Sequence, residues 1–385
     1  MYSGTGSFLD AAGSGDKSMT SRDRVARALH GEPTDRPALA YLFLGGARHV
    51  LERTGRRMAQ AYSDPGFIAE TQMAAAEMFG HDSAMVPWGC LTVEAEAFGC
   101  RLEVLEDYYP RVVERPLAQA RDLGRLSEPD PARSARMPLV LEALKELRRR
   151  AGDDLFIAAM VVSPFLVASE LRGMTALLSD FITSGDFVEE LFERITRGTQ
   201  CYLEAILRTG ACDAVLFENA GACRELMGPH HLKRYLMPYQ RRLLETARRE
   251  APGVLLIEHN CARTPYFEEI LELGVDAVSF AYGNVRAIRE RHGWDCHASH
   301  TTTNACLERH CLRPRDGGRP AAWIGNVDHS QILLKATPGQ VYEEARACLD
   351  SARGARFVLS TGCEIPFKAP LENIQALSRA ARAGF

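Results

Sequence analysis

The chain has 385 residues and a formal net charge of −4 at neutral pH, and 46% of its residues are hydrophobic. This charge balance argues against a partner such as nucleic acid or an anionic membrane, and the apolar content suffices for a large core. The longest apolar run, Leu155 to Val162, is too short to span a bilayer.

The start of the chain and its cysteines indicate the cellular compartment. Residues 1–18 contain Gly and Ser but no basic region followed by an apolar one, so we expect a mobile tail and no signal peptide. Eleven cysteines, an odd number in a long chain, favour reduced thiols and metal chemistry over a disulfide framework. We therefore expect a cytoplasmic protein.

The first third of the chain predicts a helix, two strands and an insertion. Thr20 is placed to cap a helix that ends at Gly31. An apolar segment at 38–44 is read as a first strand, and a second strand is expected at 83–87. Residues 91–117 then alternate apolar and polar side chains between turn signals, which predicts one or two hairpins inserted after the second strand.

The rest of the chain alternates strands with helices that end on glycine. Alternating strands and helices predict a parallel sheet, and eight strands predict an α/β protein with a single (β/α)8 TIM barrel. This barrel domain spans 19–385, with the first helix as an N-terminal extension. A doubly wound sheet is the alternative, but no G-x-G-x-x-G follows a strand. Six further strands complete the set, near 155–162, 213–218, 254–258, 276–281, 322–327 and 356–361.

Two of these strands end on residues that bind metals. His259 and Cys261 close the strand at 254–258 and, two positions apart in extended chain, point to the same side. Cys363 follows the strand at 356–361, and a barrel brings all strand ends to one mouth. Imidazole and thiolate are ligands that zinc prefers, and three protein ligands leave its fourth position open. A core histidine with two buried thiols is the alternative.

Three acidic residues lie at comparable strand ends. Glu218, Asp328 and Glu364 are candidates for a catalytic role, either as a fourth zinc ligand or as a hydrogen-bond partner of His259. The segment 283–321 is either a lid loop or a second metal site, because helical spacing relates pairs of its possible ligands. These ligands are Cys296, His297, His300, Cys306, His310 and Cys311.

Four stretches of the chain resemble one known superfamily. The opening, TSRDRVARALHGEPTDRPA from Thr20, resembles the start of the uroporphyrinogen decarboxylase superfamily. Three others resemble its corrinoid branch, the methylcobamide:thiol methyltransferases, some of which methylate coenzyme M. The resemblance implies a (β/α)8 barrel with zinc on His259, Cys261 and Cys363. The three stretches are DSAMVPWGCLTVEAEAFGC, GNVDHSQILLKATPGQVYEEARACL and FVLSTGCEIPFKAPLENIQAL.

The resemblance also implies a reaction and its partners. A methylated corrinoid (methylcobalamin) on a carrier protein donates its methyl group to a small thiol that zinc holds as thiolate. The hairpins at 91–117 are expected at the rim where the carrier docks. Coenzyme M, homocysteine or a folate all stay open as acceptor, and an anionic group on it is expected to meet an arginine such as Arg48, Arg224 or Arg263.

Two other functions stay open at this point. One is a metal-free decarboxylase of the uroporphyrinogen type. Residues 45–49, GGARH, stand where that branch carries arginines for substrate carboxylates, and two metal-ligating cysteines have no purpose in it. The other is a non-catalytic subunit that binds zinc or a corrinoid within a methyltransferase system. The pattern at 218–223, ENAGAC, also departs from the acidic-Pro-small pattern common in the family.

Overall fold

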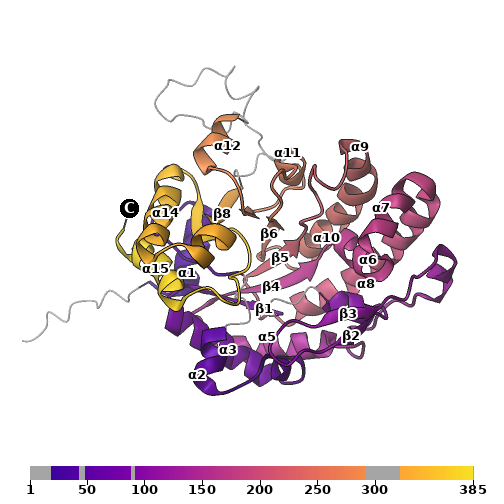
Figure 1. Ribbon diagram of the computed structural model, residues 1–385, viewed down its shortest axis with the longest axis horizontal. Helices are drawn as coiled ribbons and strands as arrows, with labels where there is room; N and C mark the ends of the chain where they lie inside the picture. The colour runs from indigo at the N-terminus through magenta and orange to yellow at the C-terminus, as the bar shows by residue number, and fades with distance from the viewer. Residues whose placement is uncertain (1–18, 43–47, 88–91, 292–320, 385) are drawn as a thin grey trace, which may run out of the picture.

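The computed structural model describes residues 19–42, 48–87, 92–291 and 321–384. The predicted tail at 1–18 lies outside the described residues, as do the six cysteines and histidines of the predicted second metal site. Strands lie at the centre of the molecule and helices surround them (Figure 1). The architecture is therefore α/β.

The core is a parallel sheet of seven strands in the order β1-β4-β5-β6-β7-β8-β9. Its strands are continuously apolar over most of their length, as expected for a sheet that is covered on both faces. Each of them falls within about two residues of a strand predicted from the sequence. The bounds are β1 Ser83–Val86, β4 Phe156–Val162, β5 Ala214–Glu218, β6 Leu255–Asn260, β7 Ala277–Phe280, β8 Ala322–Val327 and β9 Phe357–Thr361.

The predicted first strand, at 38–44, differs from the expectation. Its described part is extended but forms a single bridge, a parallel one between Leu39 and Leu359 of β9. On its other side, the amide of Asp82, just before β1, donates to the Leu39 carbonyl at 2.7 Å. The Leu39 amide donates to the Asp82 carboxylate at 3.0 Å, so a side chain replaces a backbone partner and shortens the ladder. The segment nevertheless links the two edge strands of the sheet.

Asp82 also fixes the first helix, α1 (Ser21–His30), against the strands β1, β4, β8 and β9. Its fully buried carboxylate accepts hydrogen bonds from Arg24 at 2.7 Å and from Arg36 at 2.7 and 3.0 Å. Ser21 donates a further hydrogen bond at 2.8 Å. One buried carboxylate therefore holds together α1, the extended segment and the start of β1.

Replacing Asp82 by asparagine is expected to lower the free energy of unfolding by about 3–5 kcal/mol, because Arg36 then loses its buried counter-ion and Arg24 keeps only the more exposed Asp35. A urea titration followed by circular dichroism measures the loss. Asp153→Asn is the matched control, since that carboxylate is 78% exposed and pairs with Arg22 at the surface. The control is expected to cost less than about 1 kcal/mol, and equal losses would show that Asp82 is not a structural centre.

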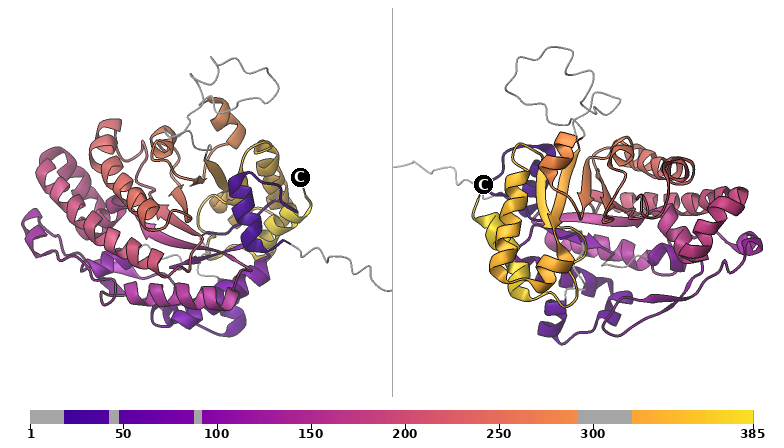
Figure 2. Two further views of the ribbon diagram at one scale, coloured as in Figure 1. Left: turned by 180° about the vertical axis from the view of Figure 1, so that it is seen from behind. Right: turned by 45° about the horizontal axis from the view of Figure 1, so that its top comes forward.

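The helices form a continuous layer outside the sheet, as the views in Figures 1 and 2 agree. Around this layer, α14 packs on α15, α15 on α3, α3 on α5, α5 on α8, and α8 on α10. Among the helices that the structure describes, none is both long and apolar enough to cross a membrane. The longer ones are α3 Pro65–Phe79, α5 Met137–Ala151, α6 Pro164–Arg172, α7 Met174–Thr183, α8 Gly185–Arg208, α10 Met237–Glu250, α14 Pro338–Ser351 and α15 Leu371–Arg382, and the shorter ones α2 Arg48–Thr54, α9 Pro229–His231, α11 Phe267–Leu271 and α12 Val285–Arg291.

The insertion predicted as one or two hairpins contains a helix and one strand pair. Residues 93–97 form a short helix, α4 (Val93–Ala97), whose glutamates and alanines are good helix formers despite their alternating pattern. The two strands that follow, β2 (Arg101–Glu103) and β3 (Arg111–Glu114), pair antiparallel outside the main sheet. We call residues 101–114 the β2–β3 hairpin.

Candidate metal centre

Three strand ends meet at one point of the sheet. His259 lies near the end of β6, Cys261 directly follows that strand, and Cys363 comes two residues after β9. One ligand atom from each residue can be chosen so that all three lie within 4.8 Å of one another. In a flat sheet, three strand spacings of about 4.8 Å would keep β6 and β9 about 14 Å apart. The curvature of the sheet therefore brings the third ligand to the first two.

Strand register places the neighbours of His259. Glu218 on β5 pairs with His259, and Ser279 on β7 pairs with it on the other side. The Ser279 hydroxyl lies 2.9 Å from Nδ1 of the ring, while a carboxylate oxygen of Glu218 lies 3.6 Å from Nε2. A hydrogen bond at one ring nitrogen orients the other toward a metal. A metal at this centre would therefore be bound through Nε2.

Cys363 depends on the glycine that precedes it. A side chain at Gly362 would meet the backbone of Ala281, just after β7, at 2.7 Å. The Gly362 amide donates to the Val327 carbonyl at 2.9 Å, and the Thr361 hydroxyl donates to the Cys363 carbonyl at 2.6 Å. Only glycine allows this close approach, which directs the Cys363 thiol inward.

The electrostatics of the site favour a bound cation. Burial by itself lowers the pKa of His259, but the Glu218 carboxylate and the nearby Cys261 outweigh it and raise this pKa. The adjacent Cys363 thiol and burial hold the pKa of Cys261 well above its usual range. Burial raises the pKa of Glu218, and His259 opposes this shift. A divalent cation would lower these raised pKa values of Cys261 and Glu218, because it stabilises the thiolates and the carboxylate together.

Behind the site, a buried polar network holds the loop after β5. Glu258 of β6 accepts hydrogen bonds from Asn219 at 2.6 Å and Gln240 at 2.9 Å, and burial raises its pKa to about 8. The Asn260 side chain donates to the carbonyls of Asn219 and Ala222 at 2.9 Å. The sequence analysis identified none of these supporting residues, although alternation along β6 could have indicated that Glu258 and Asn260 share the face opposite His259.

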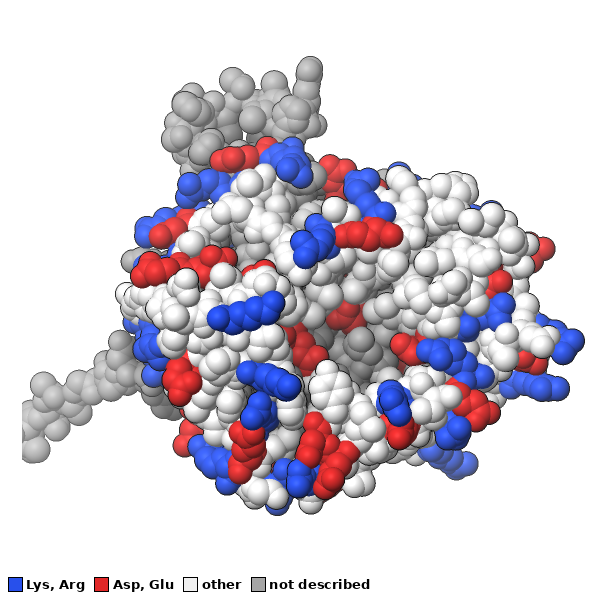
Figure 3. Space-filling model, viewed as in Figure 1, with Lys and Arg blue, Asp and Glu red and all other residues white. Residues whose placement is uncertain are grey.

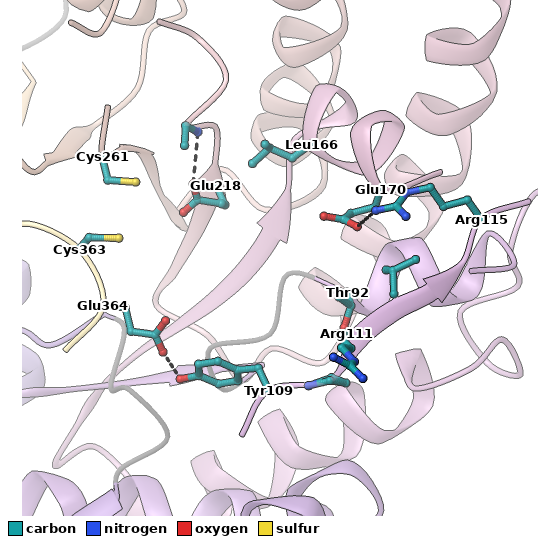
Figure 4. A pocket seen from close by; sticks show the side chains of 13 residues that line it. Thr92, Tyr109, Arg111, Arg115, Leu166, Glu170, Glu218, Cys261, Cys363 and Glu364 are labelled. Atoms are coloured by element: carbon teal, nitrogen blue, oxygen red, sulfur yellow. Dashed lines mark hydrogen bonds and ion pairs between the residues drawn. The ribbon is translucent and has the colours of Figure 1, made fainter. Parts of the chain in front are cut away.

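The three acidic candidates have different surroundings. Glu218 is buried beside His259. Glu364 faces the same pocket but accepts a hydrogen bond from the Tyr109 hydroxyl (Figure 4). Asp328 caps the helical turn at His329–Leu333, accepting from the amides of Ser330 and Gln331 at 2.8 Å. The geometry therefore places Glu218 closest to a metal-linked role.

The candidate metal centre opens into a pocket of about 540 Å³. Both cysteines lie on one side of this pocket, and side chains of the β2–β3 hairpin form the other side (Figure 4). Figure 3 shows a hollow near the middle of this face, with acidic side chains inside it and charges of both signs around it. The site is thus open to a small molecule from solvent.

The arginines proposed for an anionic group lie elsewhere. Arg48 pairs with Glu52 at 2.6 Å, and the guanidinium groups of Arg224 and Arg263 stack over tyrosine rings. None of the three lines the pocket of the candidate metal centre. Arg111 and Arg115 line it instead. Strand alternation within the insertion gave no signal for them, because both are exposed, Arg111 in the β2–β3 hairpin and Arg115 directly after it.

Comparisons with known proteins agree on one family. The model of the uroporphyrinogen decarboxylase (URO-D) family matches residues 20–384. The methylcobamide:CoM methyltransferase MtbA of Methanosarcina acetivorans is 26% identical over 366 residues, covering 94% of this chain and 98% of the relative. MtaA of Methanosarcina barkeri, with the same activity in its name, is 25% identical over 360 residues, covering 93% and 96%.

Two further comparisons bear on fold and on the alternative. A uroporphyrinogen decarboxylase from Anaeromyxobacter is 25% identical over 351 residues, covering 85% of this chain and 97% of the relative. The solved structure of a methyltransferase from Methanosarcina mazei superposes with a TM-score of 0.79 at 24% identity, covering 95% of this chain and 99% of that one. The fold is thus shared along nearly the whole chain.

Proposed function

The chain belongs to the uroporphyrinogen decarboxylase family, and from this premise we propose that it is a corrinoid-dependent methyltransferase that methylates a thiol held by zinc. The observation that carries the proposal is the convergence of one imidazole and two thiols in an accessible pocket. The relatives named as methylcobamide:CoM methyltransferases span nearly the whole chain and support the same reaction class.

The donor set fits zinc. One histidine and two cysteines are zinc ligands in catalytic sites that keep a fourth position open, and the Ser279 hydroxyl holds the histidine ring through Nδ1. The described cysteines are all free, so both thiols are available as ligands. When bound, zinc lowers the pKa of an incoming thiol so that it is held as thiolate, the form that attacks a methyl group.

The chain's own residues prepare this transfer. His259, Cys261 and Cys363 would hold the metal, and Glu218 would either occupy the fourth position at rest or stay beside His259 as its carboxylate partner. The chemistry that zinc and the corrinoid would supply is transfer of the methyl carbon to the thiolate sulfur, with the electron pair of the broken cobalt–carbon bond left on the donor. We also propose that the seven strands form a TIM barrel in which the segment at 38–42 takes the place of the eighth strand.

The β2–β3 hairpin is the proposed docking rim for a corrinoid carrier protein. Of the four large hydrophobic side chains that are most exposed among the described residues, this hairpin carries Val104, Tyr108 and Val113. Tyr108 packs edgewise on Phe367, and Tyr109 next to it lines the pocket. An apolar patch beside an active-site mouth is typical of a partner interface. The proposed location of both proteins is the cytoplasm.

We expect the purified zinc protein to release about one proton per zinc when the correct thiol is added in weak buffer, because the thiol must deprotonate to bind. Methylcobalamin should then lose its methyl group, with a cobalt spectral change that requires both zinc and thiol. A pH-stat and absorbance spectroscopy measure the two events.

The controls separate the alternatives. A metal-free decarboxylase would act on a porphyrinogen carboxylate after chelation and would release no proton with thiols. A non-catalytic subunit would bind zinc but leave methylcobalamin unchanged with every thiol. Demethylation at the same rate after zinc removal would contradict the proposed mechanism.

A further inference from the structure

Cys261 and Cys363 are two thiols in one pocket, and such a pair has redox chemistry of its own. We propose that a peroxide joins their sulfur atoms in a disulfide, which empties the metal centre and switches the enzyme off until a reductant restores both thiols. This inference rests on the proposed function, since it concerns the regulation of that same site. Such a switch requires two sulfurs that meet, that an oxidant reaches, and that the site needs.

The two thiols meet although their strands do not pair. In the sheet, β7 and β8 separate β6, which ends just before Cys261, from β9, which ends just before the Cys363 turn. The ligand atoms of the cluster nevertheless lie within 4.8 Å of one another, and in Figure 4 both sulfurs point into the same pocket. A hydrogen bond from the Cys363 thiol is also the largest influence that raises the pKa of Cys261. A disulfide requires a sulfur–sulfur distance of about 2.05 Å, and rotation of the two side chains about χ1 can bring the sulfurs together.

An oxidant can reach both sulfurs. The two cysteines are partly exposed, and both line the pocket of about 540 Å³. Cys201 is exposed on α8 but does not line this pocket. The other described cysteines are buried, namely Cys100, Cys212, Cys223 and Cys348. Of the described thiols, only the two in the pocket therefore meet a small molecule that enters it.

The two sulfurs of the site are also in the form that reacts. They are thiolates whenever the site holds zinc, and the thiolate is the form of cysteine that peroxides oxidise. Elsewhere in the fold, burial raises the pKa of Cys212 and of Cys348 to about 12, so these thiols stay protonated. Oxidation is therefore expected first at the pocket.

One peroxide supplies everything that the step consumes. The first thiolate takes an oxygen atom from hydrogen peroxide, becomes a sulfenic acid and leaves hydroxide. The second thiolate attacks the sulfenic sulfur, which forms the S–S bond and releases a second hydroxide. The sulfur pair thus loses two electrons and the peroxide gains them. A dithiol reverses the step by thiol–disulfide exchange, in which its own sulfurs become the disulfide.

The disulfide removes two of the three protein ligands at once. His259 keeps its contacts with Ser279 and Glu218, but these residues lack the sulfur ligands that hold zinc here. The barrel should stay folded, because neither cysteine belongs to the apolar core. The switch therefore acts on the metal centre alone.

The test treats the zinc protein with a small excess of hydrogen peroxide. A chromophoric chelator measures released zinc, intact mass measures the loss of two hydrogens, and peptide mapping locates the new bond. We expect about one zinc released per disulfide, with one linked peptide pair that contains Cys261 and Cys363. A phosphine reductant, which is not a methyl acceptor of the thiol class, should restore both thiols, and added zinc should then bind again.

Cys201→Ser is the matched control, because that exposed thiol lies outside the pocket and its loss should leave zinc release unchanged. Cys363→Ser should give no linked peptide that contains Cys261. Zinc that stays bound, with both thiols still free, would overturn the inference. A sulfinic or sulfonic acid that the phosphine fails to reduce would overturn it as well, because the change would then be damage and no switch.

The methylcobalamin assay separates this inference from the proposed function. If the untreated zinc protein methylates no thiol, yet peroxide links the two cysteines reversibly and releases zinc, the proposed function is wrong and the redox switch stands. If methyl transfer proceeds and keeps its full rate after peroxide treatment, the function stands and the inference is wrong.

Discussion

Replacing Cys363 by alanine is expected to remove both the zinc and the methyl transfer activity. Cys363 is one of only two thiols in the three-residue cluster, so its loss leaves an imidazole and a single sulfur, too few to hold zinc tightly. Changes to residues that only support a ligand cost about 10–100-fold, and loss of a ligand itself should cost more than about 100-fold. Metal analysis and the methylcobalamin assay measure the two losses.

The fold should survive this change. Cys363 is partly exposed at a strand end, and its removal leaves the apolar core of the sheet intact. Circular dichroism should therefore be unchanged. Cys201→Ala is the control, because that thiol is exposed on α8 and should affect neither zinc nor rate. A Cys363→Ala protein that keeps full activity would show that zinc-held thiolate is not the nucleophile.

The strand ends were predictable because their signal is local. The apolar runs that became β6 and β9 finish on His259, Cys261 and Cys363, and parallel strands must present their ends on one edge of the sheet. The spacing of His259 and Cys261 further indicates a common side. Side-chain alternation thus indicated the His259–Cys261 pair, whereas the meeting of Cys363 with this pair depended on the expectation of a curved, closed sheet.

Other parts of the site depend on contacts that no local pattern encodes. The Asp82 carboxylate accepts the hydrogen bond of the Leu39 amide. The segment at 38–42 therefore forms one β-bridge, although its apolar character predicted a strand. Ser279 reaches His259 only through the register of β6 with β7. Arg111 and Arg115 are exposed residues of an insertion, and only the packing of that insertion over the mouth makes them part of the pocket.

The roles of the three acidic residues can be separated by one set of variants. Glu218 is buried, with a carboxylate oxygen 3.6 Å from Nε2 of His259, the nitrogen assigned to the metal. We expect Glu218→Gln to weaken zinc binding by about 10–100-fold, because the change removes the anionic oxygen while preserving the shape of the side chain. Competition with a chromophoric chelator measures the zinc affinity of each variant.

The other two carboxylates should behave differently because each already has a structural task. Glu364→Gln keeps an acceptor for the half-buried Tyr109 hydroxyl and should leave zinc affinity within about threefold of the wild type, because this hydrogen bond is preserved. Asp328→Ala removes a helix cap and should lower the free energy of unfolding by about 1 kcal/mol with zinc affinity unchanged. Zinc affinity could instead fall in the Glu364 or Asp328 variant and stay unchanged in Glu218→Gln. The carboxylate beside His259 would then have no role in zinc binding. The fourth position must then be supplied from the pocket side.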